Sequence, residues 1–190
     1  MDLLIVADSV ERTQPLLHAA GEAGYRMVKF VGPNDEVALY ASSMEVDAIV
    51  FVCDEIERAE LREMRSITES CPMPMLVLTR DARQTSIDAA VRAGVSAYVV
   101  NCVDLSRLAS LLQVARARFN QHRELINELN TARSALEQRK VIEKAKGIIM
   151  RQRNLDEDHA YRAMRKLAMD HNKKIAEVAG QIVTAAEVLL

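Results

Sequence analysis

The chain has 190 residues, of which 49% are hydrophobic and 27% charged, and it contains only six glycines and four prolines. This composition excludes a disordered, collagen-like or low-complexity chain, and the length suits one full-sized domain plus a smaller module. The formal net charge of −2 favours no class of partner until it is divided along the chain.

No apolar run approaches the roughly 20 residues that a bilayer span requires. The acidic start, Asp2-Leu3-Leu4, is unlike a signal peptide. Three scattered cysteines without metal-ligand spacing predict reduced thiols in a cytoplasmic protein. We also expect no metal and no cofactor. They are Cys53, Cys71 and Cys102.

Five short apolar runs alternate with helix-length segments over the first hundred residues. Such runs of Val, Ile and Leu between helices are typical of βαβ units, whose parallel sheet is covered on both faces. Five repeats in about 104 residues predict a flavodoxin-like, doubly wound α/β domain over residues 1–118. The expected strands are Leu3–Ala7, Met27–Val31, Ala48–Cys53, Met75–Thr79 and Ala97–Val100, and the expected helices span 11–23, 34–43, 57–70 and 82–93.

The residues at the carboxyl ends of these strands resemble the receiver domains of bacterial response regulators. Such domains bind Mg²⁺ through paired acids after the first strand, and they carry an acceptor Asp, a Thr or Ser and a Lys after the third, fourth and fifth strands. Here Ala7 replaces one acid, Val52 stands at the acceptor position and Asn101 stands at the Lys position. The resemblance therefore implies a pseudo-receiver that responds to another protein, with Asp54 as the only candidate acceptor. The receiver-site remnants are Asp8, Asp54, Thr79 and Asn101.

A long stretch without Gly or Pro follows the last strand. It predicts one continuous helix from Asp104, as its N-cap, to about residue 152, with residues 119–139 as a helical coiled-coil linker. Seven residues along it recur at the alternating spacing of a coiled coil, which favours a homodimer, while a solvated spacer helix remains the alternative. These residues are Ala115, Phe119, His122, Ile126, Leu129, Arg133 and Leu136.

Residues 140–190 predict a three-helix module made of the end of the long helix and two shorter helices. Asn154 stands three residues before Glu157, as in a capping box, and is expected to cap the second helix. Asn172 is expected to cap the third. The apolar stripes that we expect in the core contain Ile142, Ala145, Ile148, Ile149, Ala160, Ala163, Met164, Leu167, Ala168, Ile175, Val178, Ala179, Ile182 and Ala186.

The charge of the chain is divided between its two parts. Residues 1–118 hold 12 basic against 17 acidic residues, whereas residues 139–174 hold 11 against 5. Lys173 and Lys174 directly follow the expected cap, where positive charge opposes the helix macrodipole. This placement favours an anion-docking point over a merely solubilising face.

The residue types leave the kind of nucleic acid open. Tyr161 is the one aromatic of the module, so no broad stacking platform exists. Three helices with short turns are compatible with a helix-turn-helix that binds duplex DNA. They are equally compatible with a module that binds the unstacked bases of an RNA loop.

Three segments of the tail resemble the ANTAR module. They are Ile142-Glu143-Lys144-Ala145-Lys146-Gly147-Ile148-Ile149-Met150, Asp158-His159-Ala160-Tyr161-Arg162-Ala163-Met164-Arg165 with Ala168-Met169, and Ile175-Ala176-Glu177-Val178-Ala179. With its receiver-like front, the whole chain is similar to nitrate/nitrite-assimilation antiterminators of the NasT type, which are relatives of AmiR.

This resemblance implies RNA binding without catalysis. ANTAR proteins bind paired stem-loops with hexanucleotide loops in a leader mRNA and so prevent the terminator hairpin from forming. The resemblance also implies a NasS-like nitrate/nitrite sensor protein as partner. Gly147 either allows close backbone approach or eases helix packing. By motif position, the expected principal RNA contacts are Lys146 and Arg165, and Tyr161 is expected to stack or pack beside them. The expected phosphate contacts are Arg151, Arg162, Lys173 and Lys174.

Two other function classes remain open from the residues. A DNA-binding response regulator would read bases with the second helix, although its acidic start, residues 156–158, would face phosphates. A protein-binding adaptor would leave Lys173 and Lys174 unexplained. An enzyme is disfavoured because no nucleophile has an adjacent base. The four histidines share no motif: His18, His122, His159 and His171.

Overall fold

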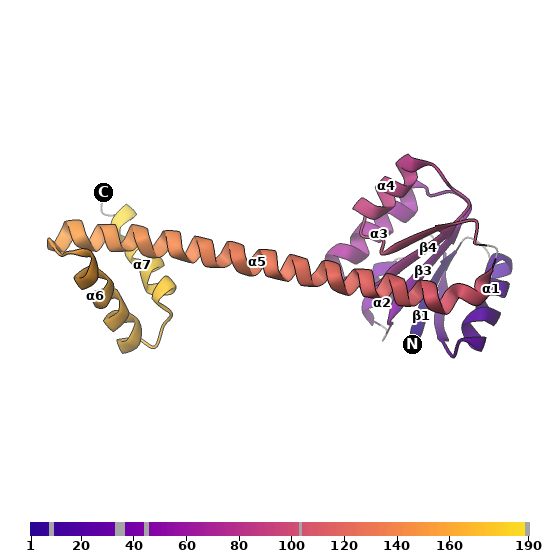
Figure 1. The fold of residues 1–190 in the computed structure, drawn as a ribbon, viewed down its shortest axis with the longest axis horizontal. Helices are drawn as coiled ribbons and strands as arrows, with labels where there is room; N and C mark the ends of the chain where they lie inside the picture. The colour runs from indigo at the N-terminus through magenta and orange to yellow at the C-terminus, as the bar shows by residue number, and fades with distance from the viewer. Residues whose placement is uncertain (8–9, 33–36, 44–45, 103, 189–190) are drawn as a thin grey trace. The chain divides into compact units, whose positions relative to one another are not determined.

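The computed structural model describes residues 1–7, 10–32, 37–43, 46–102 and 104–188. Its N-terminal part holds a five-stranded parallel sheet in the order β2-β1-β3-β4-β5, with helices on its faces (Figure 1). This is the strand order of a flavodoxin-like fold, so the predicted α/β domain is confirmed. The strands are β1 (Asp2–Ala7), β2 (Arg26–Val31), β3 (Ala48–Cys53), β4 (Met75–Thr79) and β5 (Ala97–Val100).

Four helices connect the strands, and each lies within a segment expected to be helical or within one residue of it. Of the expected helix over 34–43, residues 34–36 lie outside the described residues. Side chains of a strand alternate between the two faces of the sheet. Leu4 and Phe51 therefore pack with α3, whereas Ile5 and Val50 pack with α1 and α5. The helices are α1 (Val10–Glu22), α2 (Val37–Ser43), α3 (Arg58–Ser70) and α4 (Gln84–Arg92).

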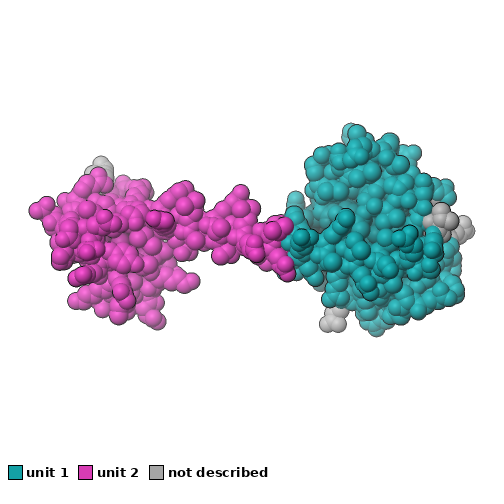
Figure 2. All heavy atoms as spheres, in the orientation of Figure 1, with its two compact units in different colours: residues 1–123 teal, residues 124–190 magenta. Residues whose placement is uncertain are grey.

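The long helix α5 runs from Leu108 to Arg153 without interruption over 46 residues. Asp104 does act as an N-cap, because its carboxylate accepts a 3.0 Å hydrogen bond from the backbone N–H of Ser106. The turn that it caps is a 3₁₀ turn, Leu105–Arg107, and the α-helix begins only after it. The chain divides into two compact units, residues 1–123 and 124–190, and α5 contributes to both (Figure 2).

The expected seam on α5 is shorter than the sequence suggests. Ala115 is fully buried in the first unit, in the cluster that covers the sheet, so it is unavailable to a coiled coil. Phe119 lies 5.7 Å beneath the guanidinium of Arg123, a cation–π contact that partly covers it. The seam residues that remain exposed and apolar are Ile126, Leu129 and Leu136.

The second unit closes a small core between the end of α5, α6 (Glu157–Asp170) and α7 (Ile175–Val188). The predicted stripes meet there, except that Leu167 is 39% exposed. No helix in the described part of the chain has both the length and the apolar character of a membrane span. The most deeply buried core residues are Ala145, Ala160, Met164 and Ala179.

Both predicted asparagine caps are wrong, because each asparagine ends one helix rather than beginning the next. Asn154 and Asn172 have φ angles of 50° and 51°, a left-handed conformation that asparagine tolerates. The following N–H groups reach back to the preceding helix, from Leu155 to the carbonyl of Met150 and from Lys173 to that of Ala168. Such bonds form a Schellman motif, and α6 is capped instead by Asp156, which accepts from the N–H of His159 at 2.8 Å.

Candidate nucleic-acid interface

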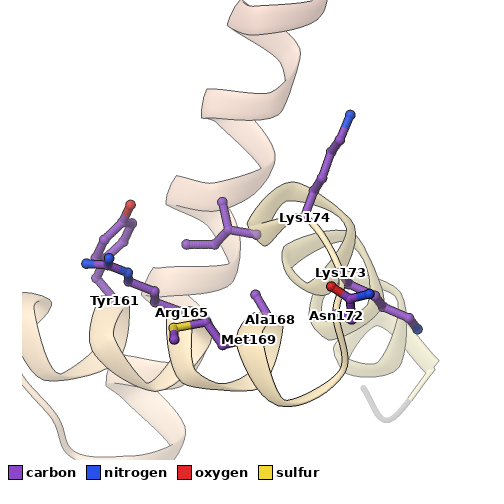
Figure 3. A pocket seen from close by; sticks show the side chains of 8 residues that line it. Tyr161, Arg165, Ala168, Met169, Asn172, Lys173 and Lys174 are labelled. Carbon is purple, nitrogen blue, oxygen red and sulfur yellow. The ribbon is translucent and has the colours of Figure 1, made fainter.

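A pocket of about 500 Å³ lies where α6 ends and α7 begins (Figure 3). It brings together four of the seven residues that the sequence predicts as RNA contacts. Tyr161 and Arg165 reach it from α6, whereas Lys173 and Lys174 come from the connection to α7.

Helix α6 places Tyr161 and Arg165 on the same side. The two residues are four apart, so their side chains are neighbours on the helix surface. The adjoining stripe of Ala160, Met164 and Ala168 is buried in the core of the second unit. Burial of that stripe directs Tyr161, which is 43% exposed, and Arg165 outward.

The cations of the pocket are available to a ligand. Within the described residues, the side chains of Arg165, Lys173 and Lys174 pair with no carboxylate. The two lysines precede α7, which starts at Ile175, so they do not occupy its first turn as expected. Their position relative to the macrodipole is therefore weaker evidence for an anion site than the sequence suggests. The observation that remains is that both lysines line the same pocket as Arg165, on its other side (Figure 3).

Apolar side chains complete the lining, and none of them was among the predicted site residues. Ala168 and Ile175 were expected in the core, whereas Met169, which is 72% exposed, had no predicted role. The signal was present in the sequence, because Met169 falls off the buried stripe of α6. An apolar lining next to three cations suits a flat base attached to a charged phosphate backbone.

Lys146 lies outside this pocket. Its side chain is only 10% exposed, and its Nζ lies 2.6 Å from Glu143 Oε2 and 2.7 Å from Glu157 Oε1. Hydrogen bonds to these two carboxylates raise the pKa of Lys146 above its usual value. The remaining predicted contacts, Arg151 and Arg162, are exposed but do not line the pocket.

Gly147 has open space around it rather than a packed neighbour. A Cβ added there would meet no atom of the described residues within 4 Å, apart from the helix's own nearby backbone. The interpretation that this glycine eases helix packing is therefore wrong. The Arg151 Nε donates a 3.2 Å hydrogen bond to the carbonyl of Gly147, and Arg151 is exposed.

The receiver-site remnants also come together, except for Asp8, which lies outside the described residues. Asp54, Thr79 and Asn101 line a second pocket of about 650 Å³ at the carboxyl edge of the sheet, next to Val52. The hydroxyl of Thr79 donates to the backbone carbonyl of Asp54 at 2.8 Å. It also accepts from the N–H of Asp81 at 3.1 Å. Thr79 is therefore engaged by the protein itself.

The loop after β4 is held by a buried carboxylate. Arg83 donates to both carboxylate oxygens of Asp81, and these bonds hold the pKa of Asp81 well below its usual range. Tyr98 donates from its hydroxyl to the carbonyl of Asp81 at 2.8 Å. Burial raises the pKa of Tyr98 to about 12, so this tyrosine remains a hydrogen-bond donor at neutral pH.

Known proteins match both parts of the chain. Residues 130–183 match the family model of the ANTAR domain. The chain is similar to the transcriptional regulatory protein PdtaR of Mycobacterium tuberculosis, with 27% identity over 93% of this chain and 87% of that protein. It is also similar to the nitrate regulatory protein of Klebsiella oxytoca, with 38% identity over 39% of this chain but only 19% of that protein.

A solved structure matches the α/β domain. A two-component response regulator from Clostridium difficile has a TM-score of 0.54 and 18% identity, over 63% of this chain and 98% of that one. At this identity the likeness shows the fold alone, and the fold is that of a receiver domain. Both relatives are named as regulatory proteins. The chain therefore joins an α/β domain, with the fold of that response regulator, to a helical segment whose residues 130–183 match the ANTAR domain.

Proposed function

We propose that this protein is an RNA-binding transcription antiterminator that holds paired stem-loops of a leader transcript and so prevents the terminator hairpin from forming. The observation that carries the proposal is the pocket of the ANTAR domain, which Arg165, Lys173 and Lys174 line together with Tyr161; among the described residues, none of these three cations pairs with a carboxylate. RNA binding by these residues also requires no catalytic group, in keeping with a regulatory role.

The lining of the pocket favours an RNA loop over duplex DNA. An open surface pocket with one exposed aromatic ring suits stacking by an unstacked base, which a loop offers and a duplex does not. The first turn of α6 carries Glu157 and Asp158, both exposed, and would meet the phosphates if α6 lay in a major groove. A recognition helix usually begins with residues that contact base edges.

We assign control of this activity to the receiver-like domain and a ligand-sensing partner protein. Thr79 is already engaged by Asp54 and Asp81, and Val52 occupies the acceptor position, so binding of a protein suits this domain better than phosphoryl transfer. The similarity of the tail to a nitrate regulatory protein favours a NasS-like sensor of nitrate or nitrite, and genes of nitrate assimilation as targets. A role on nascent transcripts requires a cytoplasmic protein.

We further propose that the active form is a homodimer held by α5. Every residue from 120 to 140 is exposed, including the seam residues Ile126, Leu129 and Leu136. A second copy of the same seam buries these side chains at heptad spacing. Two ANTAR domains in one dimer match the two stem-loops of the RNA.

A binding titration tests the RNA assignment. The full-length protein is titrated against an RNA of two tandem stem-loops with six-nucleotide loops, against the same stems with scrambled loops, and against a DNA duplex of the stem sequence. We expect tightest binding to the first RNA at two salt concentrations, with all affinities falling as salt rises. Preference for the DNA duplex would instead support the DNA-binding alternative, and binding of none would support a protein adaptor.

Gly147→Ala tests whether the RNA backbone approaches α5 at this open position. Alanine should stabilise the helix by up to about 1 kcal/mol, since no described atom obstructs its Cβ. We expect a higher melting temperature together with weaker RNA binding. Gly180→Ala in α7 is the matched control, because its Cβ is equally unobstructed, and it should be stabilising without loss of RNA affinity. Equal RNA affinity of both variants would contradict the approach at Gly147.

A further inference from the structure

Lys146 is the one lysine of the second unit whose side chain is buried among the described residues. Glu143 lies one turn earlier on α5, and Glu157 lies in the first turn of α6. The 2.7 Å contact to Glu157 therefore connects two helices, whereas the 2.6 Å contact to Glu143 stays within one helix. A lysine shielded from water keeps its charge when carboxylates hold it, as these two do.

The charges around Lys146 make it a poor phosphate ligand. One ammonium is matched by two carboxylates, so the group carries a formal charge of −1. The side chains of Glu143 and Glu157 are 56% and 70% exposed, whereas that of Lys146 is 10% exposed. A phosphate that approaches this group meets the two carboxylates before it meets the ammonium.

The position of Glu157 on α6 connects this group to the RNA pocket. Glu157, Tyr161 and Arg165 follow each other at intervals of four residues and so form one row along the helix. A contact that fixes Glu157 also fixes the direction in which the row points. The core beneath α6 is rich in alanine, with Ala145 and Ala160 fully buried. Such small side chains allow close approach but interlock little, so the helix rotation that keeps Glu157 within 2.7 Å of the Lys146 ammonium gains the energy of a charge-assisted hydrogen bond.

We propose that Lys146 is a positioning residue, which holds Glu157 and thereby sets the rotation of α6 that aims Tyr161 and Arg165 at RNA. This inference rests on the proposed RNA-binding function of the pocket. It assigns to Lys146 a role through Glu157 instead of the direct RNA contact that its motif position suggests.

Glu157→Gln distinguishes the two roles by the sign of its effect. Loss of the charge-assisted contact releases α6, so we expect affinity for the two-stem-loop RNA to fall roughly tenfold and the preference over scrambled loops to fall with it. If Lys146 bound phosphate directly, removal of the competing carboxylate would strengthen binding. Glu187→Gln is the matched control, because Glu187 is an exposed acid paired with Lys144 of α5 at 2.6 Å. We expect it to bind RNA as well as the unchanged protein does.

Lys146→Met supplies a second readout in the salt dependence of binding. Replacement of a positioning residue lowers RNA affinity by a similar factor at every salt concentration. The slope of log K against the logarithm of the salt concentration should therefore stay unchanged. Lys173→Met, an exposed lysine of the pocket, should lower that slope by about 0.7–0.9. Should Lys146→Met fail to fold, the exposed and isosteric Glu157→Gln still decides the question. Tighter RNA binding by Glu157→Gln, or a reduced salt slope for Lys146→Met, overturns the role of Lys146 but not the proposed function. If the protein without any substitution shows no preference for the six-nucleotide loops over scrambled loops, the proposed function fails, and this inference fails with it.

Discussion

Arg165→Ala is expected to abolish loop-specific RNA binding while the protein keeps its fold. Arg165 is exposed, lines the pocket beside Tyr161 and makes no ion pair among the described residues. Its guanidinium can therefore donate two parallel hydrogen bonds to a base or a phosphate. Removal of one base-reading arginine costs roughly tenfold to a hundredfold in specific affinity. The exposed position predicts an unchanged melting temperature.

Arg162→Ala is the control for that experiment. Arg162 lies on the same helix and is exposed, but it does not line the pocket. Its loss removes the same charge and should lower the affinity for all RNAs by a similar factor. The salt slope should become smaller, and the preference for the six-nucleotide loops should be retained. A similar loss of preference in both variants would show that net charge, rather than the pocket, selects the loop.

The sequence predicted the α/β domain closely because its physical signals are strong. Uninterrupted runs such as Ala48–Cys53 and Met75–Thr79 must be buried on both faces, and only a parallel sheet covered by helices buries them so. The long helix was equally clear, since nothing from Val95 to Lys146 interrupts it. The helix boundaries were harder to predict. Asn154 and Asn172 favour both N-caps and left-handed C-terminal positions, and the choice depends on whether the next N–H bonds backward.

The candidate site was predicted in composition but not in arrangement. Tyr161, Arg165, Lys173 and Lys174 meet in one pocket because a Schellman turn folds the chain back after α6, which no spacing rule specifies. Lys146 differs from them. Its motif position predicts an RNA contact, whereas the side chain is buried between carboxylates that lie before and after it in the sequence. Only the packing of α6 on α5 brings Glu157 to it.

Leu129→Asp tests the second large effect, the dependence of RNA binding on a dimer. Leu129 is 49% exposed on a helix surface that has no other cover among the described residues. Burial of one leucine from each copy stabilises a dimer by about 1.5–3 kcal/mol per side chain, and two facing aspartates replace that gain with repulsion. We therefore expect the mass in solution, measured by sedimentation, to fall from dimer to monomer.

The consequence for RNA depends on the number of stem-loops. A dimer that engages two loops on one transcript binds the second loop at a high effective concentration, so avidity exceeds the affinity for a single loop, by a hundredfold or more in well-matched cases. Leu129→Asp should lose this advantage while its affinity for a single stem-loop stays unchanged, because the pocket of each ANTAR domain is intact. Ser134→Asp adds the same charge outside the seam and should leave both the mass and the avidity unaltered. If Leu129→Asp keeps the mass and the avidity of the unchanged protein, α5 is a solvated spacer.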